Sequence, residues 1–247
     1  MDLSRPISTA IPSLDGPVLQ VLAAADRELS GRQIHSLAGS GSVAGVRLVL
    51  QRLATTGLVH VHESGNSLLY TLNRKHLAAQ AVEMLADLRT TFAANLAAEF
   101  ATWTIAPIHA SLFGPIARAD SPIARADGTT TRTDDATTRA DATTRADATT
   151  RADATTRAEG DLDSEVDLLL VRPDEVAPDN LLWVEQTTRL LEQIVAQTGN
   201  PANLYDLTHT ELTTATPTPT TWPDPAIPLT GPPLAALLQP LTLAETS

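Results

Sequence analysis

Residues 42–73 read SVAGVRLVLQRLATTGLVHVHESGNSLLYTLN, and this segment carries the clearest structural pattern in the chain. Apolar residues recur at helical spacing through its first part, which predicts a helix from Val43 to Thr55 with Gly57 as its stop. In its second part, apolar and polar residues alternate on either side of residues 64–66, which is typical of a β-hairpin with a turn at its tip. We therefore expect a helix followed directly by a two-stranded hairpin.

Two shorter helical patterns precede this segment. Residues 17–25 (PVLQVLAAA) are mostly apolar, and residues 31–39 (GRQIHSLAG) follow Ser30, a residue type favoured as a helix N-cap. A Gly-Ser-Gly-Ser turn at residues 39–42 separates the second pattern from the third helix. Three short helices followed by a hairpin give the order of a winged helix-turn-helix.

Residues 30–77 resemble the bacterial MarR/ArsR-type regulators in their run of recognition helix, Leu-x-x-x-Gly-Leu-Val, hairpin and Tyr-x-Leu-Asn. In such folds the third helix lies in the major groove of DNA and the hairpin wing reaches the backbone or minor groove. By position, the resemblance implies that the residues facing DNA around the third helix are Ser40, Ser42, Arg47 and Gln51. It implies phosphate contacts for Arg52, His62, Asn66, Arg74 and Lys75. The alternative is a solvated surface on a three-helix domain that serves only dimerisation.

Charge is unevenly distributed along the chain. The 17 basic and 29 acidic residues give a formal net charge of −12. Residues 24–76, however, hold six basic and three acidic side chains, or +3, so only a local patch can meet the phosphates of double-stranded DNA. A thin positive stripe predicts weak binding by a monomer and favours a homodimer. The chain has no cysteine, which excludes disulfides, and no apolar run long enough to span a bilayer, so we expect a cytoplasmic protein.

A length of 247 residues favours two modest domains, and the chain as a whole is predicted to be α+β. We place a winged helix-turn-helix at residues 1–75, a linker helix at residues 76–102 and a second domain at residues 103–247. The linker helix is expected to pack between the domains or to pair with its twin in a dimer. The second domain contains strand patterns, a helix at residues 178–198, a strand at residues 202–208 and a final short strand and helix.

Two segments of the second domain carry candidate chemistry. They are SLFGPIARAD at residues 111–120 and GDLDSEVDLLLV at residues 160–171, and they would be nearly contiguous without residues 121–159. Glu165 and Asp167 are spaced i, i+2 on an expected strand, so their carboxylates share a face, where they can hold Mg²⁺ ions. The alternative is a solvated strand end.

The residues between these segments are low in complexity. From Ala136 to Glu159 the chain repeats three ATTRAD hexads and one ATTRAE, with balanced charges and no large apolar residue, so it cannot build a core. We expect a disordered repeat insertion. Lengthening a loop from about 12 to about 50 residues costs only about 1.2 kcal/mol of closure entropy, so the fold should survive it.

Joined across the insertion, the two segments resemble the signature of the DNA polymerase beta-like nucleotidyltransferases, especially the minimal bacterial type. The resemblance implies a mixed sheet flanked by helices and Mg²⁺-dependent transfer of a nucleotidyl group from an NTP to a hydroxyl. It assigns phosphate binding to Gly114 and Arg118, metal binding to Glu165 and Asp167, and a third catalytic carboxylate to Asp206.

Two residues depart from that signature. Pro115 stands where the family has Ser, which removes a hydroxyl and a backbone N–H, and Glu165 stands where Asp is usual. Because phosphoryl transfer depends on positioning, both changes count against full activity. Three functions stay open: a nucleotidyltransferase, a transcriptional regulator whose second domain senses a nucleotide or dimerises, and an antitoxin-like protein, the last by family analogy alone.

Overall fold

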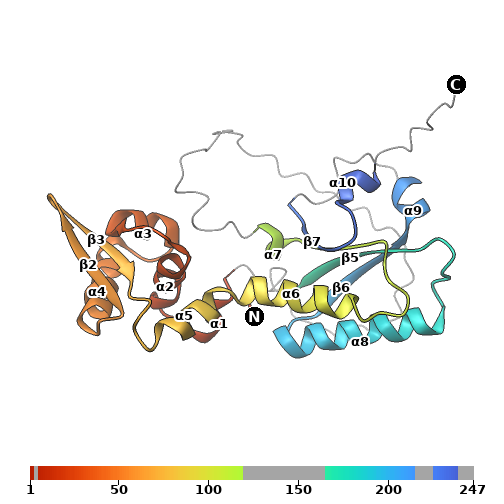
Figure 1. Ribbon diagram of the computed structural model, residues 1–247, viewed down its shortest axis with the longest axis horizontal. Helices are drawn as coiled ribbons and strands as arrows, with labels where there is room; N and C mark the ends of the chain where they lie inside the picture. The colour runs from red at the N-terminus through yellow and green to blue at the C-terminus, as the bar shows by residue number, and fades with distance from the viewer. Residues whose placement is uncertain (3–4, 119–164, 215–224, 239–247) are drawn as a thin grey trace, which may run out of the picture.

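The computed structural model describes residues 1–2, 5–118, 165–214 and 225–238. The predicted α+β class is confirmed, because helices accompany two separate β-sheets. Buried apolar side chains form one core within residues 7–82 and another that includes residues from 92 to 194. Figure 1 shows these two halves side by side, joined through helices α5 (Ala79–Ala86) and α6 (Leu88–Phe100). The repeat insertion expected at residues 121–159 lies outside the described residues.

The N-terminal half packs short helices against a small antiparallel sheet. Its elements are α1 (Ile7–Ala10), α2 (Asp15–Ala24), β1 (Leu29–Ser30), α3 (Gly31–Ala38), α4 (Val43–Thr55), β2 (Val59–Ser64) and β3 (Ser67–Leu72). The strand order is β1-β3-β2, and β2 and β3 pair along their whole length. The three predicted helices and the hairpin are confirmed as α2, α3, α4 and β2–β3, whereas α1 and β1 have no clear sequence pattern.

Side-chain caps fix where α3 and α4 begin. Ser30 Oγ accepts a hydrogen bond from the Gln33 backbone N–H at 3.3 Å, and Gln33 Oε1 accepts one from the Ser30 N–H at 2.8 Å, which makes a capping box. Ser42 Oγ accepts from the Gly45 N–H at 3.1 Å. α3 ends at Gly39, whose φ of +60° is a conformation that glycine adopts without strain. These caps set the turn between the two helices and so the face that α4 turns to solvent.

The segment after the hairpin is broken into two helices, so the prediction of one linker helix over residues 76–102 is wrong. The break is at Asp87, where φ is −91° and ψ is 5°. Val82 of α5 is buried in the N-terminal core, while Phe92 and Leu96 of α6 are buried in the C-terminal core. The two helices diverge because each packs against a different half, and no proline or glycine marks the break in the sequence.

The C-terminal half is built on a mixed four-stranded sheet. Its elements are β4 (His109–Phe113), α7 (Pro115–Arg118), β5 (Val166–Arg172), α8 (Leu181–Thr198), β6 (Ala202–Thr208), α9 (His209–Thr214), β7 (Ile227–Thr230) and α10 (Leu234–Leu237). The strand order is β6-β5-β4-β7, in which β5 and β6 are parallel and the other neighbours antiparallel. The predicted helix, strand and final strand–helix pair are confirmed as α8, β6 and β7–α10.

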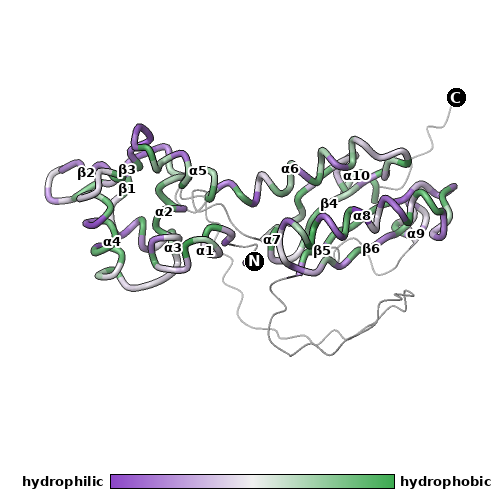
Figure 2. Tube along the Cα trace, turned by 90° about the horizontal axis from the view of Figure 1, so that it is seen from below, coloured by the Kyte–Doolittle hydropathy of each residue, from purple (hydrophilic) through white to green (hydrophobic). Residues whose placement is uncertain are grey.

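The two faces of this sheet are covered differently. On one face, Leu168 and Leu170 of β5 are buried with α6 and with Trp183 of α8. On the other face, Leu169 and Val171 pack with residues of α9 and α10. Figure 2 shows the hydrophobic stretches of β4 and β5 within this half, while α8 alternates between hydrophobic and hydrophilic residues. Asp167, the second residue of β5, shares the face of Leu169 and is only half-buried. No helix in the described ranges is long and apolar enough to cross a membrane.

Candidate functional site

Helix α4 turns one face to the core and the other to solvent. Its buried side chains are Val46, Val49, Leu50 and Leu53. Its outward side chains, all exposed, include Ala44, Arg47, Leu48, Gln51 and Thr55. The helix contains no Asp or Glu, so its outward face carries no negative side chain. A helix about 10–12 Å across fits a groove about 12 Å wide, which is the width of the major groove of B-DNA.

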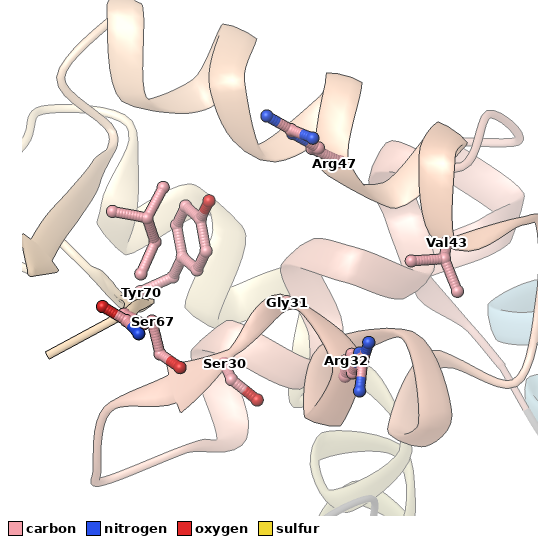
Figure 3. Close-up of a pocket in the computed structure, with 9 residues that line it drawn as sticks. Ser30, Gly31, Arg32, Val43, Arg47, Ser67 and Tyr70 are labelled. Atoms are coloured by element: carbon pink, nitrogen blue, oxygen red, sulfur yellow. The ribbon is translucent and has the colours of Figure 1, made fainter. Parts of the chain in front are cut away.

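An open cavity of about 490 Å³ lies between α3, α4 and the tip of the hairpin (Figure 3). It is lined by Ser30, Gly31, Arg32, Val43, Arg47, Asn66, Ser67, Leu68 and Tyr70. None of these nine residues is acidic, and Arg32 and Arg47 come from two different helices. The cavity can therefore receive an anionic group such as a phosphate. Sequence patterns do not indicate Arg32, because its place beside α4 depends on how α3 packs against α4.

Most of the residues predicted to face DNA are exposed. Arg47 and Gln51 lie on the outward face of α4, and Lys75 is exposed beyond the end of β3. Ser42 is exposed as well, although its Oγ is already engaged in capping α4. Ser40 differs, because its Oγ is buried. The structure thus presents most of this predicted set to solvent and turns the Ser40 hydroxyl away from it.

Two predicted phosphate contacts have partners within the protein. Arg74 donates to the backbone carbonyls of Ala23 and Ala25 at 3.1 and 3.2 Å and pairs with a glutamate of α5. Arg74 thus ties the end of the hairpin to α2 and α5, although 53% of its side chain stays exposed, and its predicted phosphate contact stays a prediction. Arg52 pairs with Asp15 of α2, although 59% of its side chain stays exposed. Part of its charge is therefore already neutralised.

A second candidate site lies where β4, β5 and β6 meet at one end of the C-terminal sheet. Glu165 and Asp167 are half-buried at the start of β5, and their i, i+2 spacing places them on one face. Gly114 follows β4 with a φ of +74°, and a side chain at this position would collide with the Asp167 carboxylate. Glycine is therefore required both by the turn into α7 and by the close approach of Asp167 to the backbone.

Asn203 of β6 completes this carboxylate cluster. Its Nδ2 donates to Glu165 Oε2 at 2.7 Å and to Asp167 Oδ1 at 3.1 Å. The parallel register pairs Asn203 directly with Asp167. One amide thus bridges both carboxylates through charge-assisted hydrogen bonds and offsets part of their repulsion. The sequence shows Asn203 only as a polar residue in an expected strand.

Asp206, the predicted third carboxylate, is not brought to this cluster. It follows Asn203 by three residues, and strand side chains alternate faces with a period of two, so it lies on the opposite face of the sheet. There its Oδ2 accepts a hydrogen bond from Trp183 Nε1 at 2.9 Å and pairs with Arg172 Nη1 at 2.6 Å. Arg172 is only 4% exposed, so Asp206 neutralises a buried cation. Its predicted place beside the carboxylate pair is corrected.

Two aromatic rings border the carboxylates. The Phe113 and Tyr205 rings lie 5.2 Å apart between centroids and are tilted by 57°. Burial, together with the negative charges of Asp167 and Glu165, raises the pKa of Tyr205 above its ordinary value. Its hydroxyl therefore stays protonated at neutral pH, and the site combines negative charge with an aromatic wall.

The phosphate-binding prediction is only partly described. Arg118 ends α7, and its side chain lies outside the described residues. α7 itself is held by Arg89 of α6, whose Nη2 donates to the Ala117 carbonyl at 3.2 Å. Sequence patterns do not indicate Arg89, which comes from a different segment of the chain. Pro115 opens the helix without a backbone N–H.

The chemistry of the cluster allows a test of its fit to magnesium. Carboxylate oxygens are suitable Mg²⁺ ligands, and Glu165 and Asp167 supply them. Within the described ranges, no group of three or more His, Cys, Asp or Glu residues is placed to hold a metal ion. The Asn203 amide donates where a further ligand would have to accept. The described residues therefore fit one weakly held divalent cation better than the two ions of two-metal phosphoryl chemistry.

No protein-family model, curated protein or solved structure matches this chain. Two surfaces therefore carry its functional interpretation. The first is the outward face of α4 with the cavity beside it, which is suited to a polyanion. The second is the carboxylate cluster with its aromatic border.

Proposed function

We propose that the protein binds duplex DNA through a winged helix-turn-helix formed by its N-terminal half, as the MarR/ArsR resemblance implies. The observation that carries the proposal is the outward face of α4, which exposes Arg47 and Gln51, has no acidic side chain and borders a cavity that also holds Arg32. The helix order and the adjoining β2–β3 hairpin support the same assignment. α4 enters the major groove, and the hairpin lies against the backbone.

Position in the fold separates the roles of the two arginines. In this proposal Arg32, at the start of α3, meets a backbone phosphate, while Arg47 on α4 reaches the base edges. Phosphate contacts supply much of the affinity of DNA-binding proteins, and this surface offers few of them. The acidic remainder of the chain repels DNA, so a homodimer that engages two half-sites is the expected binding form.

The salt dependence of binding tests this proposal. Fluorescence anisotropy would follow a labelled 30-base-pair duplex of mixed sequence over a range of salt concentrations, with wild type and with Arg32→Ala/Arg47→Ala. Each lost phosphate contact lowers the magnitude of the slope of log K against log salt by about 0.9, so loss of the Arg32 contact should lower it by about 0.9 for a bound monomer and about 1.8 for a bound dimer. Arg189→Ala, at an exposed position of α8, is the matched control and should keep the wild-type slope. Identical slopes in all three proteins, or no salt-dependent binding by wild type, would contradict DNA binding through this surface.

The C-terminal half supports a second function, that of a minimal nucleotidyltransferase-like domain. The observations that favour it are the mixed sheet, the shared face of Glu165 and Asp167, and the close approach of Asp167 to the Gly114 turn. In that function, Glu165 and Asp167 would hold Mg²⁺, which would neutralise the phosphates of an NTP. Gly114 would let the backbone approach those phosphates, and the aromatic border would shield the site from water.

Asn203 and Pro115 weaken the catalytic version of this function. Asn203 occupies the place where a third carboxylate would join the pair, and Pro115 removes a phosphate-binding N–H. The alternative is a regulator or antitoxin-like protein in which the C-terminal half binds a nucleotide without transferring it, or serves dimerisation. DNA binding does not depend on which of these holds.

Calorimetric titration with ATP and with GTP, each with and without Mg²⁺, tests nucleotide binding. Binding that requires Mg²⁺ and is lost in Asp167→Asn would support a working nucleotide site. A search for transfer to a hydroxyl acceptor would then separate catalysis from sensing. No heat from either nucleotide would remove this second function and leave the first untouched.

A further inference from the structure

Helix α4 exposes two large apolar side chains, Val43 at its start beside the cavity and Leu48 on its outward face. Leu48 is 67% exposed and Val43 is 52% exposed. At 100° per residue, Leu48 lies nearly opposite the buried stripe, at the part of the helix that projects furthest from the core. It is flanked by Arg47 on one side and Arg52 on the other, and Gln51 lies one turn further along.

These apolar side chains are not needed by the protein core. The buried stripe of α4 already supplies its packing, and both Ser42 and the turn before it hold the helix start in place. Exposed apolar residues that stand singly need no explanation. Here, however, a large leucine stands among the cationic and amide groups proposed to read DNA.

We infer that Leu48 contacts a thymine methyl group, so that the preferred DNA site carries a thymine beneath the second turn of α4. This inference rests on the DNA-binding function proposed above and names the bases it prefers. The C5 methyl of thymine is the apolar group that A·T pairs present in the major groove. A leucine excluded from the protein core gains burial by covering such a methyl.

The neighbouring polar residues fit the same kind of site. Residues three apart on a helix are neighbours, so Leu48 and Gln51 reach the same or adjacent base pairs. A glutamine amide pairs with N6 and N7 of adenine, the partner of thymine, while Arg47 pairs with O6 and N7 of guanine. The preferred site therefore combines A·T pairs under Leu48 and Gln51 with a neighbouring G·C pair under Arg47.

A second copy of the chain is a less suitable occupant of this face. A two-fold contact centred on Leu48 brings the same residues of both copies together. It would place Arg47 near its counterpart, with no acidic residue anywhere on α4 to compensate. The absence of carboxylates is complementary to a polyanion and unfavourable for self-association.

Replacement of thymine by deoxyuridine removes only the methyl group and so tests the contact directly. Wild-type protein would first select binding sequences from duplexes with 20 random central base pairs. The enriched duplex would then be made with thymine or with deoxyuridine, and both forms titrated with wild type, Leu48→Ala and Leu181→Ala. Leu181, 85% exposed on α8, is the matched control.

For wild type and Leu181→Ala, we expect about fourfold weaker binding for each contacted methyl that is removed. Leu48→Ala should bind the thymine duplex more weakly and lose most of its sensitivity to deoxyuridine. Equal binding of both duplexes by wild type, or equal sensitivity in Leu48→Ala, would overturn the inference while leaving DNA binding in place. Failure to enrich any duplex, together with no salt-dependent binding, would overturn the DNA-binding function itself.

Discussion

Replacing Asn203 with aspartate should turn the bridging amide into a repulsive carboxylate. The wild-type amide donates to Glu165 at 2.7 Å and to Asp167 at 3.1 Å, and both hydrogen bonds end on carboxylates. Hydrogen bonds to charged groups contribute about 1.5–3 kcal/mol each, and the low value suits these half-buried acceptors. Asn203→Asp loses both bonds, a loss of about 3 kcal/mol.

Like-charge repulsion adds to this loss. A third carboxylate about 4 Å from another costs about 1 kcal/mol in water and about 4 kcal/mol at an effective dielectric constant of 20. The variant should therefore lose about 3–5 kcal/mol of unfolding free energy at pH 7.5. At about 2–4 °C per kcal/mol for a chain of 150–250 residues, its midpoint should fall by at least about 6 °C.

The same variant should respond to pH and to magnesium. Repulsion from two neighbouring carboxylates raises the folded-state pKa of the introduced carboxyl group above its unfolded value, so the folded state binds that proton more tightly. The destabilisation is then present at neutral pH and is relieved as pH falls through the raised pKa. Three carboxylates can also hold a divalent cation, so Mg²⁺ should stabilise Asn203→Asp by binding its folded state.

Thermal unfolding followed by circular dichroism would measure the loss of stability, its relief at low pH and the stabilisation by Mg²⁺. It would be carried out at pH 7.5 and at pH 5, each with and without about 10 mM MgCl₂. Asn66→Asp, at the exposed hairpin tip, adds the same charge far from the cluster and is the matched control. A variant that melts within about 1 °C of wild type and ignores Mg²⁺ would refute the bridging role of Asn203.

Three further substitutions separate structural residues from binding residues. Gly114→Ala should lose about 2 kcal/mol or more of unfolding free energy, measured by urea unfolding, because φ is +74° and the new methyl group collides with Asp167. Wild-type stability in this variant would contradict the close approach of Asp167 to Gly114. Asp206→Ala should lose about 3–5 kcal/mol of unfolding free energy, because it leaves Arg172 buried and unpaired. Calorimetric binding of Mg²⁺ by the folded fraction should not change, and weaker binding would show that Asp206 belongs to the carboxylate site. Arg74→Ala should lower the melting temperature without changing the salt slope of DNA binding, whereas a slope lower by about 0.9 would show a phosphate contact.

Local patterns were sufficient to predict much of the N-terminal half. α4 and its hairpin follow from helical spacing, from the Gly57 stop and from the turn at residues 64–66, all of which lie within one short segment. The partners of Arg52 and Arg74 were beyond such reasoning, because they come from α2 and α5. Arg32 was missed for the same reason. Which charged residues remain available to DNA is therefore a property of tertiary packing.

The carboxylate cluster shows a different limit. The spacing of Glu165 and Asp167 placed them correctly on one face of a strand, since the period of two is local. The third member depended on the register between β5 and β6, and an odd shift along a strand moves a side chain to the other face. Asp206 and Asn203 differ by three positions, and because the sequence does not show the register of β6, the prediction chose Asp206 on the other face in place of the bridging amide of Asn203.

The break at Asp87 has a mechanical consequence. α5 packs in one core and α6 in the other, so a change in backbone angles at this residue would rotate one half relative to the other, within the limit set by Met1, whose carbonyl accepts a hydrogen bond from Asn200 of the C-terminal half at 2.7 Å. α4 lies at the far end of the N-terminal half from this joint (Figure 1), so a small rotation is amplified into a larger sweep of the helix. In a dimer held together by its C-terminal halves, the reach between the two DNA-reading helices would be set at this joint. Tolerance for the distance between half-sites would then be determined at Asp87, about thirty residues along the chain from the end of α4.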